Sequence, residues 1–168
     1  MHPKIALGSA QFGMSYGVNG SAQVPHIELG RILSLAALSG VKVIDTAHLY
    51  GTALSALGRY HKLISNRKFR IVTKVPRVPG QINFESIFKL KDTFLKDLRR
   101  LNQTSVDTLM IHDAQDLLRS GSDLLYDFLL NMKLLGLCDK IGVSVYHPEE
   151  IDQQTLSYGC FTVSNECA

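Results

Sequence analysis

Short apolar runs alternate along the chain with longer segments of helical periodicity. The runs of β type are Ile5–Gly8, Lys42–Asp45, Phe69–Lys74, Val106–His112 and Lys140–Ser144. Five strand-then-helix units in succession predict parallel strands joined by crossover helices, because neighbouring parallel strands need a connection of a dozen or more residues. The pattern therefore predicts an α/β fold.

The clearest helix is expected over residues 84–101. The pairs Glu85/Lys89 and Asp92/Lys96 have helical spacing and mark its polar side. Its expected apolar stripe consists of Phe84, Ile87, Phe88, Phe94, Leu95, Leu98 and Leu101.

Three further helices are indicated by proline or glycine residues at their ends. The segment Ile27–Leu38 lies between Pro25 and Gly40, and a second apolar stripe, from Leu125 to Leu135, ends before Gly136. Pro148, followed by two glutamates, is expected in the first turn of another helix.

Two architectures fit five such units. A doubly wound, flavodoxin-like sheet would be complete with five, whereas a (β/α)8 barrel would be incomplete. The predicted strands start about every 34 residues, so that eight units would need about 270 residues, near the typical length of the barrel. The chain has 168 residues, and composition does not choose between the two folds.

Composition excludes several functional classes. The chain is 45% hydrophobic and 20% charged, with a net charge of +3, which fits one soluble domain and gives no basis for binding nucleic acid or an acidic membrane. No signal peptide or membrane span is recognisable. The cysteines Cys138, Cys160 and Cys167 are odd in number and lack metal-site spacing. We expect a cytoplasmic protein without a metal site, whose partner is a small molecule.

The first strand is followed by a glycine-rich loop from Gly8 to Gly13. Its glycine spacing is that of a phosphate-binding loop, but Met14 stands where the lysine of that loop would be. The dinucleotide fingerprint is missing as well. The glycines are therefore expected to turn the chain out of the first strand, which counts against the flavodoxin-like fold.

Reactive side chains follow the next three strands. Asp45 and Lys74 end the second and third strands, His112 ends the fourth, and Tyr50 lies shortly after Asp45. Each has a structural explanation when taken alone, as a cap, a solvated strand end, a loop residue or a packing aromatic. Because the carboxyl ends of parallel strands meet at one rim, their joint occurrence predicts a site.

These four groups suit the protonation of a carbonyl oxygen. A neighbouring ammonium, Lys74, would lower the pKa of the Tyr50 phenol, and Asp45 would hold that lysine in place and protonated. His112 would hydrogen-bond the substrate oxygen and orient the carbonyl. No side chain donates hydride, so a nicotinamide or similar cofactor is required.

Five segments together resemble the N-terminal part of an aldo/keto reductase: Leu7–Gly13, Ile44–Gly51, Val72–Val75, Val106–Asp113 and Lys140–Ser144. The resemblance implies a partial (β/α)8 TIM barrel of five to six βα units, forming one incomplete domain over residues 1–168. It also implies NADPH-dependent reduction of aldehydes or ketones to alcohols, with NADH as the alternative cofactor.

The same resemblance implies roles for individual residues. Tyr50 would be the proton donor, Lys74 and Asp45 would tune it, and His112 would place the carbonyl. Cofactor contacts are expected from Gly8, Ser9, Asp45 and Ser144. Relatives commonly have Asn after this serine; here Val145 follows, so that only Ser144 carries over.

The end of the chain departs from the family pattern. Residues 158–168 show no resemblance to the strands that follow in the family. Two functional readings remain open: a reductase whose activity is impaired by truncation, or a catalytically inactive partial barrel that acts as a binding or regulatory module or has no function. Open barrel edges would in either case favour self-association.

Overall fold

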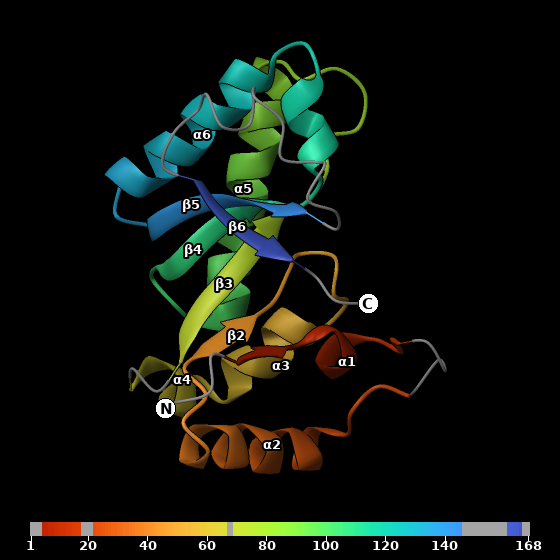
Figure 1. Cartoon of the computed structure of the whole chain (residues 1–168), viewed down its shortest axis with the longest axis vertical. Helices are drawn as coiled ribbons and strands as arrows, with labels where there is room; N and C mark the ends of the chain where they lie inside the picture. Colours follow the sequence, from red (N-terminus) through yellow and green to blue (C-terminus); the bar gives the residue numbers. More distant parts are fainter. Residues whose placement is uncertain (1–4, 18–21, 67–68, 146–160, 166–168) are drawn as a thin grey trace.

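The computed structural model describes residues 5–17, 22–66, 69–145 and 161–165 (Figure 1). Within them, six parallel strands form one sheet in the order β1-β2-β3-β4-β5-β6. The strands are β1 (Ala6–Gly8), β2 (Val43–Asp45), β3 (Arg70–Val75), β4 (Val106–Ile111), β5 (Cys138–Val145) and β6 (Phe161–Asn165).

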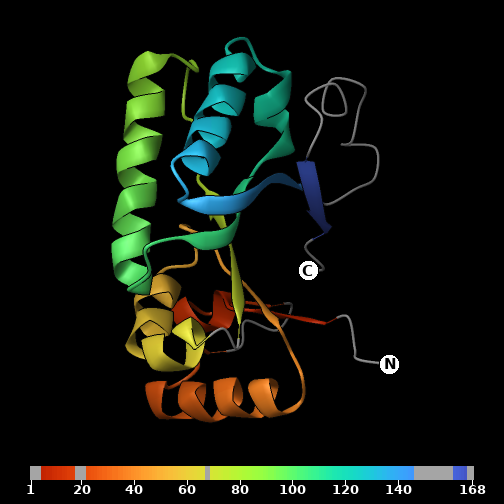
Figure 2. The ribbon, with the colours of Figure 1, turned by 90° about the vertical axis from the view of Figure 1, so that its left-hand side faces the viewer.

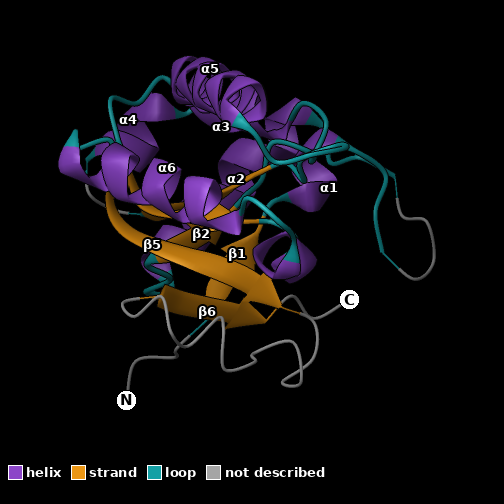
Figure 3. Ribbon diagram, turned by 90° about the horizontal axis from the view of Figure 1, so that it is seen from above, coloured by secondary structure: helices purple, strands orange, loops and turns teal. Residues whose placement is uncertain are grey.

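Helices connect the strands and cover one face of the sheet. In chain order they are α1 (Ala10–Gly13), α2 (His26–Leu38), α3 (Ala53–Arg59), α4 (His61–Ser65), α5 (Phe84–Leu101), the 3-10 helix η1 (Ala114–Leu118) and α6 (Ser122–Leu134). Figure 3 shows α3, α5 and α6 on the same side of the strands, and Figure 2 shows the long α5 beside α6. No helix in the described ranges is long and apolar enough to cross a membrane.

The strand order decides between the two predicted architectures. Each strand pairs with the next one along the chain, as in a barrel, whereas a flavodoxin-like sheet places its first strand between the second and third. All six strands are parallel, and the prediction of a partial (β/α)8 barrel is confirmed. β1 and β6 form the two edges of the sheet.

The two faces of the sheet have different side chains. The strand register places Gly8 beside Asp45 and Asp45 beside Val72, two residues before Lys74. It places Lys74 beside Met110, and Met110 beside Gly142. Since successive side chains alternate between faces, these residues share one face, which we call the inner face. The opposite face is apolar and packs against the helices.

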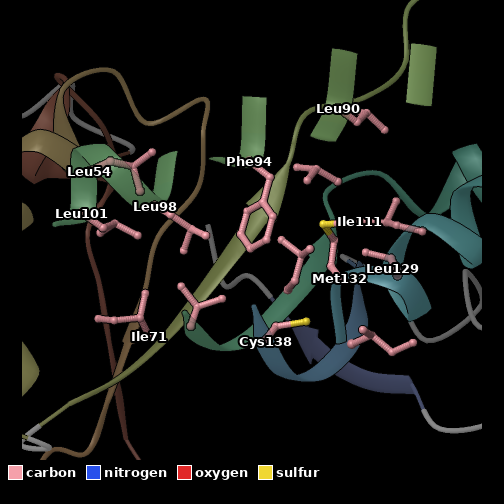
Figure 4. Close-up of a cluster of buried hydrophobic side chains, with 14 of the residues drawn as sticks. Leu54, Ile71, Leu90, Phe94, Leu98, Leu101, Ile111, Leu129, Met132 and Cys138 are labelled. Atoms are coloured by element: carbon pink, nitrogen blue, oxygen red, sulfur yellow. The ribbon is translucent and has the colours of Figure 1, made fainter. Parts of the chain in front are cut away.

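The hydrophobic core lies between that apolar face and the helices (Figure 4). Ile71 and Ile111 from the sheet meet Phe94 and Leu98 from α5, and all four are almost fully buried. Burial of each such side chain contributes about 1.5–3 kcal/mol relative to exposure. The core therefore fixes α5 against the strands that carry the candidate site.

The predicted helix over residues 84–101 is confirmed, with a correction to its buried face. The side chains of Phe84 and Phe88 are both 72% exposed, although both were placed in the apolar stripe. At about 100° per residue they point roughly 80° and 120° away from Phe94 around the helix axis, outside the face that meets the sheet. Leu90 and Asp97 are buried instead.

Both ends of α5 and its polar side have clear local causes. Asn83 caps the first turn in a reciprocal capping box with Ser86, and Asn102 ends the helix in the left-handed conformation. The predicted pair Glu85/Lys89 is formed at 2.6 Å, and Lys89 lowers the pKa of the Glu85 carboxyl by hydrogen bonding and by its charge. Asp92/Lys96 is formed as well.

Several elements differ from the sequence predictions. The segments α1, α3 and α4 are helical where no separate helix was expected, and β6 lies in the segment for which no element was predicted. The helices after Pro25 and before Gly136 are confirmed as α2 and α6. The helix expected at Pro148 lies outside the described residues.

Cys138, the first residue of β5, is buried and should be chemically inert in the native chain. Burial raises the pKa of its thiol to about 11, so the reactive thiolate is scarce near pH 8. We expect a Cys160→Ser/Cys167→Ser variant to react with a disulfide reagent at pH 8 about 100-fold more slowly when native than in urea, where the pKa is about 8.5.

The same shift has a defined effect on stability. The unfolded thiol ionises above about pH 8.5, whereas the native thiol stays neutral up to about pH 11, so its contribution to the free energy of unfolding is full below pH 8.5 and declines between these values. In the thiol experiment above, equal rates of reaction of Cys138 with the disulfide reagent in native and in unfolded protein would contradict the burial of this residue.

Candidate functional site

The candidate residues come from neighbouring strands and meet at the carboxyl end of the sheet. Asp45 is the last residue of β2, Lys74 lies one residue before the end of β3, and His112 follows β4 directly. Asp45 and Lys74 share the inner face, and His112 follows Met110 of that face by two residues. Tyr50 lies in the loop between β2 and α3.

A buried ion pair forms the base of the site. The Nζ atom of Lys74 lies 2.5 Å from Oδ1 of Asp45, and the lysine side chain is fully buried while the aspartate side chain is 20% exposed. A buried ammonium without a counter-charge would be strongly unfavourable, so the carboxylate is what permits a charged lysine at this position.

Tyr50 lies above this ion pair with its phenol toward the lysine. Lys74 Nζ donates to the Tyr50 hydroxyl at 3.4 Å and is 5.3 Å from the centre of the ring. The ring of His112 meets the Tyr50 ring edge-on, with the two centres 6.1 Å apart. The structure thus brings together Asp45, Lys74, Tyr50 and His112, as the sequence analysis expected.

The loop that carries Tyr50 is pressed against α1. Gly51 has a φ of +55°, which favours glycine, and a Cβ atom there would lie 2.4 Å from the carbonyl oxygen of Gly13. A Cβ atom at Gly13 would in turn lie 1.9 Å from the Tyr50 carbonyl oxygen. The Thr52 N–H donates to Gly13 O at 3.1 Å. The two backbones therefore touch without intervening side chains.

The same loop is tied to α5 on its other side. His48 Nδ1 donates to Oδ2 of the buried Asp97 at 2.8 Å. Arg100, one turn further along α5, donates from Nη2 to the carbonyl oxygen of Gly51 at 2.6 Å and from Nη1 to Oδ1 of Asp97 at 3.2 Å. Residues on both sides of Tyr50 are thereby attached to one helix.

Sequence reasoning missed Asp97 and Arg100. One signal was present: Asp97 follows Phe94 by three residues and precedes Leu101 by four, so it lies on the apolar face of the helix. A carboxylate at such a position needs a buried partner. Its partner, His48, lies 49 positions earlier in the chain.

The residues expected to contact a cofactor lie at the same rim. Gly8 ends β1, Ser9 precedes α1, and Ser144 is on the inner face of β5. Ser9 Oγ and Ser144 Oγ are buried and have no hydrogen-bond partner within the described residues. A Cβ atom at Gly8 would meet no heavy atom within 4 Å there. Two buried hydroxyl groups and an unobstructed backbone position are thus available to a polar ligand.

A cavity of about 330 Å³ lies elsewhere, between the loop after β3 and the first turns of α5. None of the four candidate residues lines it. Val78 in that loop donates its N–H to Asp116 at 3.0 Å, and Arg119 donates to both Asp116 and the Val78 carbonyl, which holds the loop against η1. The cavity is therefore separate from the chemistry of the rim.

The arrangement can deliver a proton to an oxygen atom. A phenol next to an ammonium loses its proton more readily, since the ammonium stabilises the phenolate. The imidazole beside it offers a second hydrogen-bonding group for the same acceptor. Within the described residues no group of three or more His, Cys, Asp or Glu side chains is placed to hold a metal ion.

Comparison with known proteins identifies a family and several solved structures that the chain is similar to. A sequence model of the aldo/keto reductase family matches residues 4–167. A protein of Pseudomonas aeruginosa assigned to the aldo-keto reductases is similar in structure, with a TM-score of 0.66 and 26% identity over 83% of this chain and 54% of its own. No curated protein sequence matches the chain.

Two further solved structures share the fold. An aldo-keto reductase of Bombyx mori, in complex with NADP, has a TM-score of 0.65 and 19% identity over 91% of this chain and 50% of its own. A reductase of Brucella melitensis has a TM-score of 0.62 and 22% identity over 97% of this chain and 57% of its own. The chain spans about half the length of these relatives.

Proposed function

Because the chain belongs to the aldo/keto reductase family, we propose that its rim catalyses the NAD(P)H-dependent reduction of an aldehyde or ketone to an alcohol. The single observation that carries the proposal is the convergence of Asp45, Lys74, Tyr50 and His112. The Lys74 ammonium touches both the Asp45 carboxylate and the Tyr50 phenol. This is an arrangement for donating a proton to a carbonyl oxygen.

In the proposed reaction each of the four side chains has a task in proton donation. Tyr50 donates its hydroxyl proton to the carbonyl oxygen, and Lys74 stabilises the phenolate that remains. Asp45 holds the lysine beside the phenol. His112 hydrogen-bonds the same carbonyl oxygen and so orients the substrate. The product is an alcohol, and solvent returns the proton to Tyr50.

The reaction also needs hydride, which no side chain can donate and which a nicotinamide cofactor would supply when bound. The rim fits such a cofactor, since Ser9 and Ser144 place buried hydroxyl groups there that have no partner within the described residues. We assign Ser144 and Ser9 to hydrogen bonds with the cofactor. Gly8, which has no side chain, would let the cofactor approach the backbone closely, and Asp45 would contact the cofactor from the same rim. The NADP in the Bombyx mori structure supports this cofactor class.

The proposal is tested by binding and by turnover in the 168-residue chain. NADPH fluorescence should report binding, and absorbance at the reduced nicotinamide band should fall when an aldehyde is added from a broad panel. NADPH binding without any carbonyl-dependent oxidation would instead favour the binding-module reading. Failure of both measurements would remove the catalytic proposal for this chain.

Ser144→Ala should weaken NADPH binding by about 3–10-fold, the effect of losing one hydrogen bond. Thr73→Val is the matched control: Thr73 Oγ1 is also buried without a partner in the described residues, but it lies on the face opposite Lys74. Unchanged NADPH affinity in Ser144→Ala, or an equal loss in Thr73→Val, would contradict the assignment of Ser144.

A further inference from the structure

The segment that carries Tyr50 is hydrogen-bonded to one polar patch of α5, formed by Asp97, which accepts from His48, and Arg100, which donates to Gly51. Asp97 is 3% exposed and uses each carboxylate oxygen for a different partner: Oδ2 for His48 and Oδ1 for Arg100. A carboxylate in the packed face of a helix is costly unless it is paired. The two hydrogen-bond partners therefore offset the cost of burying the Asp97 carboxylate at this position.

Arg100 extends the patch to the far side of Tyr50. Its Nη2 donates to the carbonyl oxygen of Gly51 at 2.6 Å, and its Nε donates to Ser55 Oγ at 3.3 Å. The planar guanidinium thus contacts Asp97, the loop and α3 at once, each through a different nitrogen atom.

The two attachment points enclose the candidate proton donor. His48 precedes Tyr50 by two residues, and Gly51 follows it. The His48 N–H also donates to the carbonyl oxygen of Lys74 at 3.2 Å, so the loop, the third strand and α5 meet at this residue. Movement of either attachment point would change the 3.4 Å contact between the Tyr50 hydroxyl and Lys74 Nζ.

We propose that Asp97 and Arg100 are positioning residues, which hold the Tyr50 hydroxyl against Lys74 by fixing His48 and Gly51. The inference rests on the proposed function for its kinetic consequence, but its structural consequence does not. Catalytic groups held by a rigid helix keep productive geometry, and a displacement of about 1 Å can cost about 100-fold in rate.

The first test compares two aspartates of α5. Asp97→Ala removes the buried partner of His48, whereas Asp92→Ala, the matched control, removes an exposed partner of Lys96 on the same helix. At a temperature where both variants are folded, Asp97→Ala should lower kcat about 10–100-fold with NADPH affinity unchanged within about twofold. Asp92→Ala should leave both unchanged.

A second variant guards against misfolding of the first. Arg100→Lys keeps a positive charge beside Asp97 but lacks the planar guanidinium that also bonds the Gly51 carbonyl oxygen and Ser55 Oγ. It should lower kcat in the same direction with NADPH affinity preserved. Wild-type kcat in a folded Asp97→Ala or Arg100→Lys variant would overturn the proposal.

The decisive readout is the titration of the Tyr50 phenol, followed by NMR with tyrosine labelled at the carbon that bears the hydroxyl. The chain has six tyrosines, and the Tyr50→Phe spectrum identifies the signal. Groups near Tyr50 that also influence it are Lys74, Asp45, His112 and Tyr16, and none is altered in Asp97→Ala.

The sign of the shift separates position from charge. Removing the Asp97 carboxylate would by its charge alone lower the pKa of the phenol, because one negative charge near the phenolate is lost. Displacement of Tyr50 from Lys74 raises it. We therefore expect a higher pKa for Tyr50 in Asp97→Ala and no change in Asp92→Ala.

The titration keeps the two proposals distinguishable. If the wild-type chain shows no turnover but Asp97→Ala raises the pKa of Tyr50, the positioning role stands and the proposed function fails. A pKa of Tyr50 that is unchanged or lowered in folded Asp97→Ala would overturn the positioning role whatever the turnover.

Discussion

Replacing Tyr50 with phenylalanine is expected to reduce carbonyl-dependent NADPH oxidation by about 10²–10⁴-fold, the usual contribution of a positioned acid or base. The substitution removes one oxygen atom and keeps the ring that packs edge-on against His112. Lys74 and Asp45 retain their ion pair. NADPH affinity, measured by fluorescence, should therefore stay within about twofold, and the loss should appear in kcat.

Tyr16→Phe is the matched control for this variant. The centre of the Tyr16 ring lies 6.5 Å from that of the Tyr50 ring, but within the described residues no hydrogen bond joins Tyr16 to Lys74. Turnover in Tyr16→Phe should remain close to that of the wild-type chain. Retained turnover in Tyr50→Phe, or an equal loss in Tyr16→Phe, would remove Tyr50 from the proton-donating role.

The strands and their polar ends were predictable because both depend on local pattern. A buried parallel strand is a continuous apolar run, and the change to a polar residue at its end is visible in the sequence at Asp45 and Lys74. Parallel strands bring their carboxyl ends to one rim, so convergence followed from the fold class alone.

The helices after Asp45 and after Gly8 were not predictable in the same way. α3 buries most of its first turns, including Ala53, Leu54 and Leu57, so its apolar residues form no clear stripe against a polar face. α1 has only four residues, too few for a periodic pattern. In both cases tertiary packing decides the helical conformation.

The attachment of the Tyr50 loop to α5 depends on contacts that no local pattern contains. His48 and Asp97 are separated by 49 positions in the chain. The exposed Phe84 and Phe88 show the converse error, since apolar residues on a helix were assigned to its buried face. Only the placement of α5 against the sheet shows that Asp97 is buried and that Phe84 and Phe88 are exposed.

One of the proposed cofactor groups, Ser144, lies on a different strand from all four proposed catalytic groups. The catalytic groups Asp45, Tyr50, Lys74 and His112 lie at or after the ends of β2, β3 and β4, whereas Ser144 is on β5, next to β6. The ion pair, the phenol and the α5 attachment thus depend on one contiguous half of the described fold. Substitutions at Tyr50 and at Ser144 should accordingly affect proton donation and cofactor binding separately. Proton donation depends in turn on the ion pair that holds Lys74 beside Tyr50.

Replacing Asp45 with alanine should lower the free energy of unfolding by about 3–5 kcal/mol, because it leaves the fully buried Lys74 ammonium without its carboxylate. Lys74→Met should cost less, since the Asp45 side chain is 20% exposed and can be hydrated. The double variant Asp45→Ala/Lys74→Met removes both charges of this pair, so most of the lost stability should return. Urea denaturation of the four proteins measures each value.

The exposed pair Asp92/Lys96 on α5 provides the control cycle, since its side chains are 58% and 61% exposed. Asp92→Ala should cost at most about 0.5 kcal/mol, and the two substitutions should be nearly additive. The contrast isolates burial, because both pairs join a lysine to an aspartate at about the same distance. The contrary outcome is a double variant Asp45→Ala/Lys74→Met that is no more stable than Asp45→Ala. It would mean that the Asp45 carboxylate does not hold Lys74 as a charged group. The proposed lowering of the pKa of Tyr50 would then lose its cause.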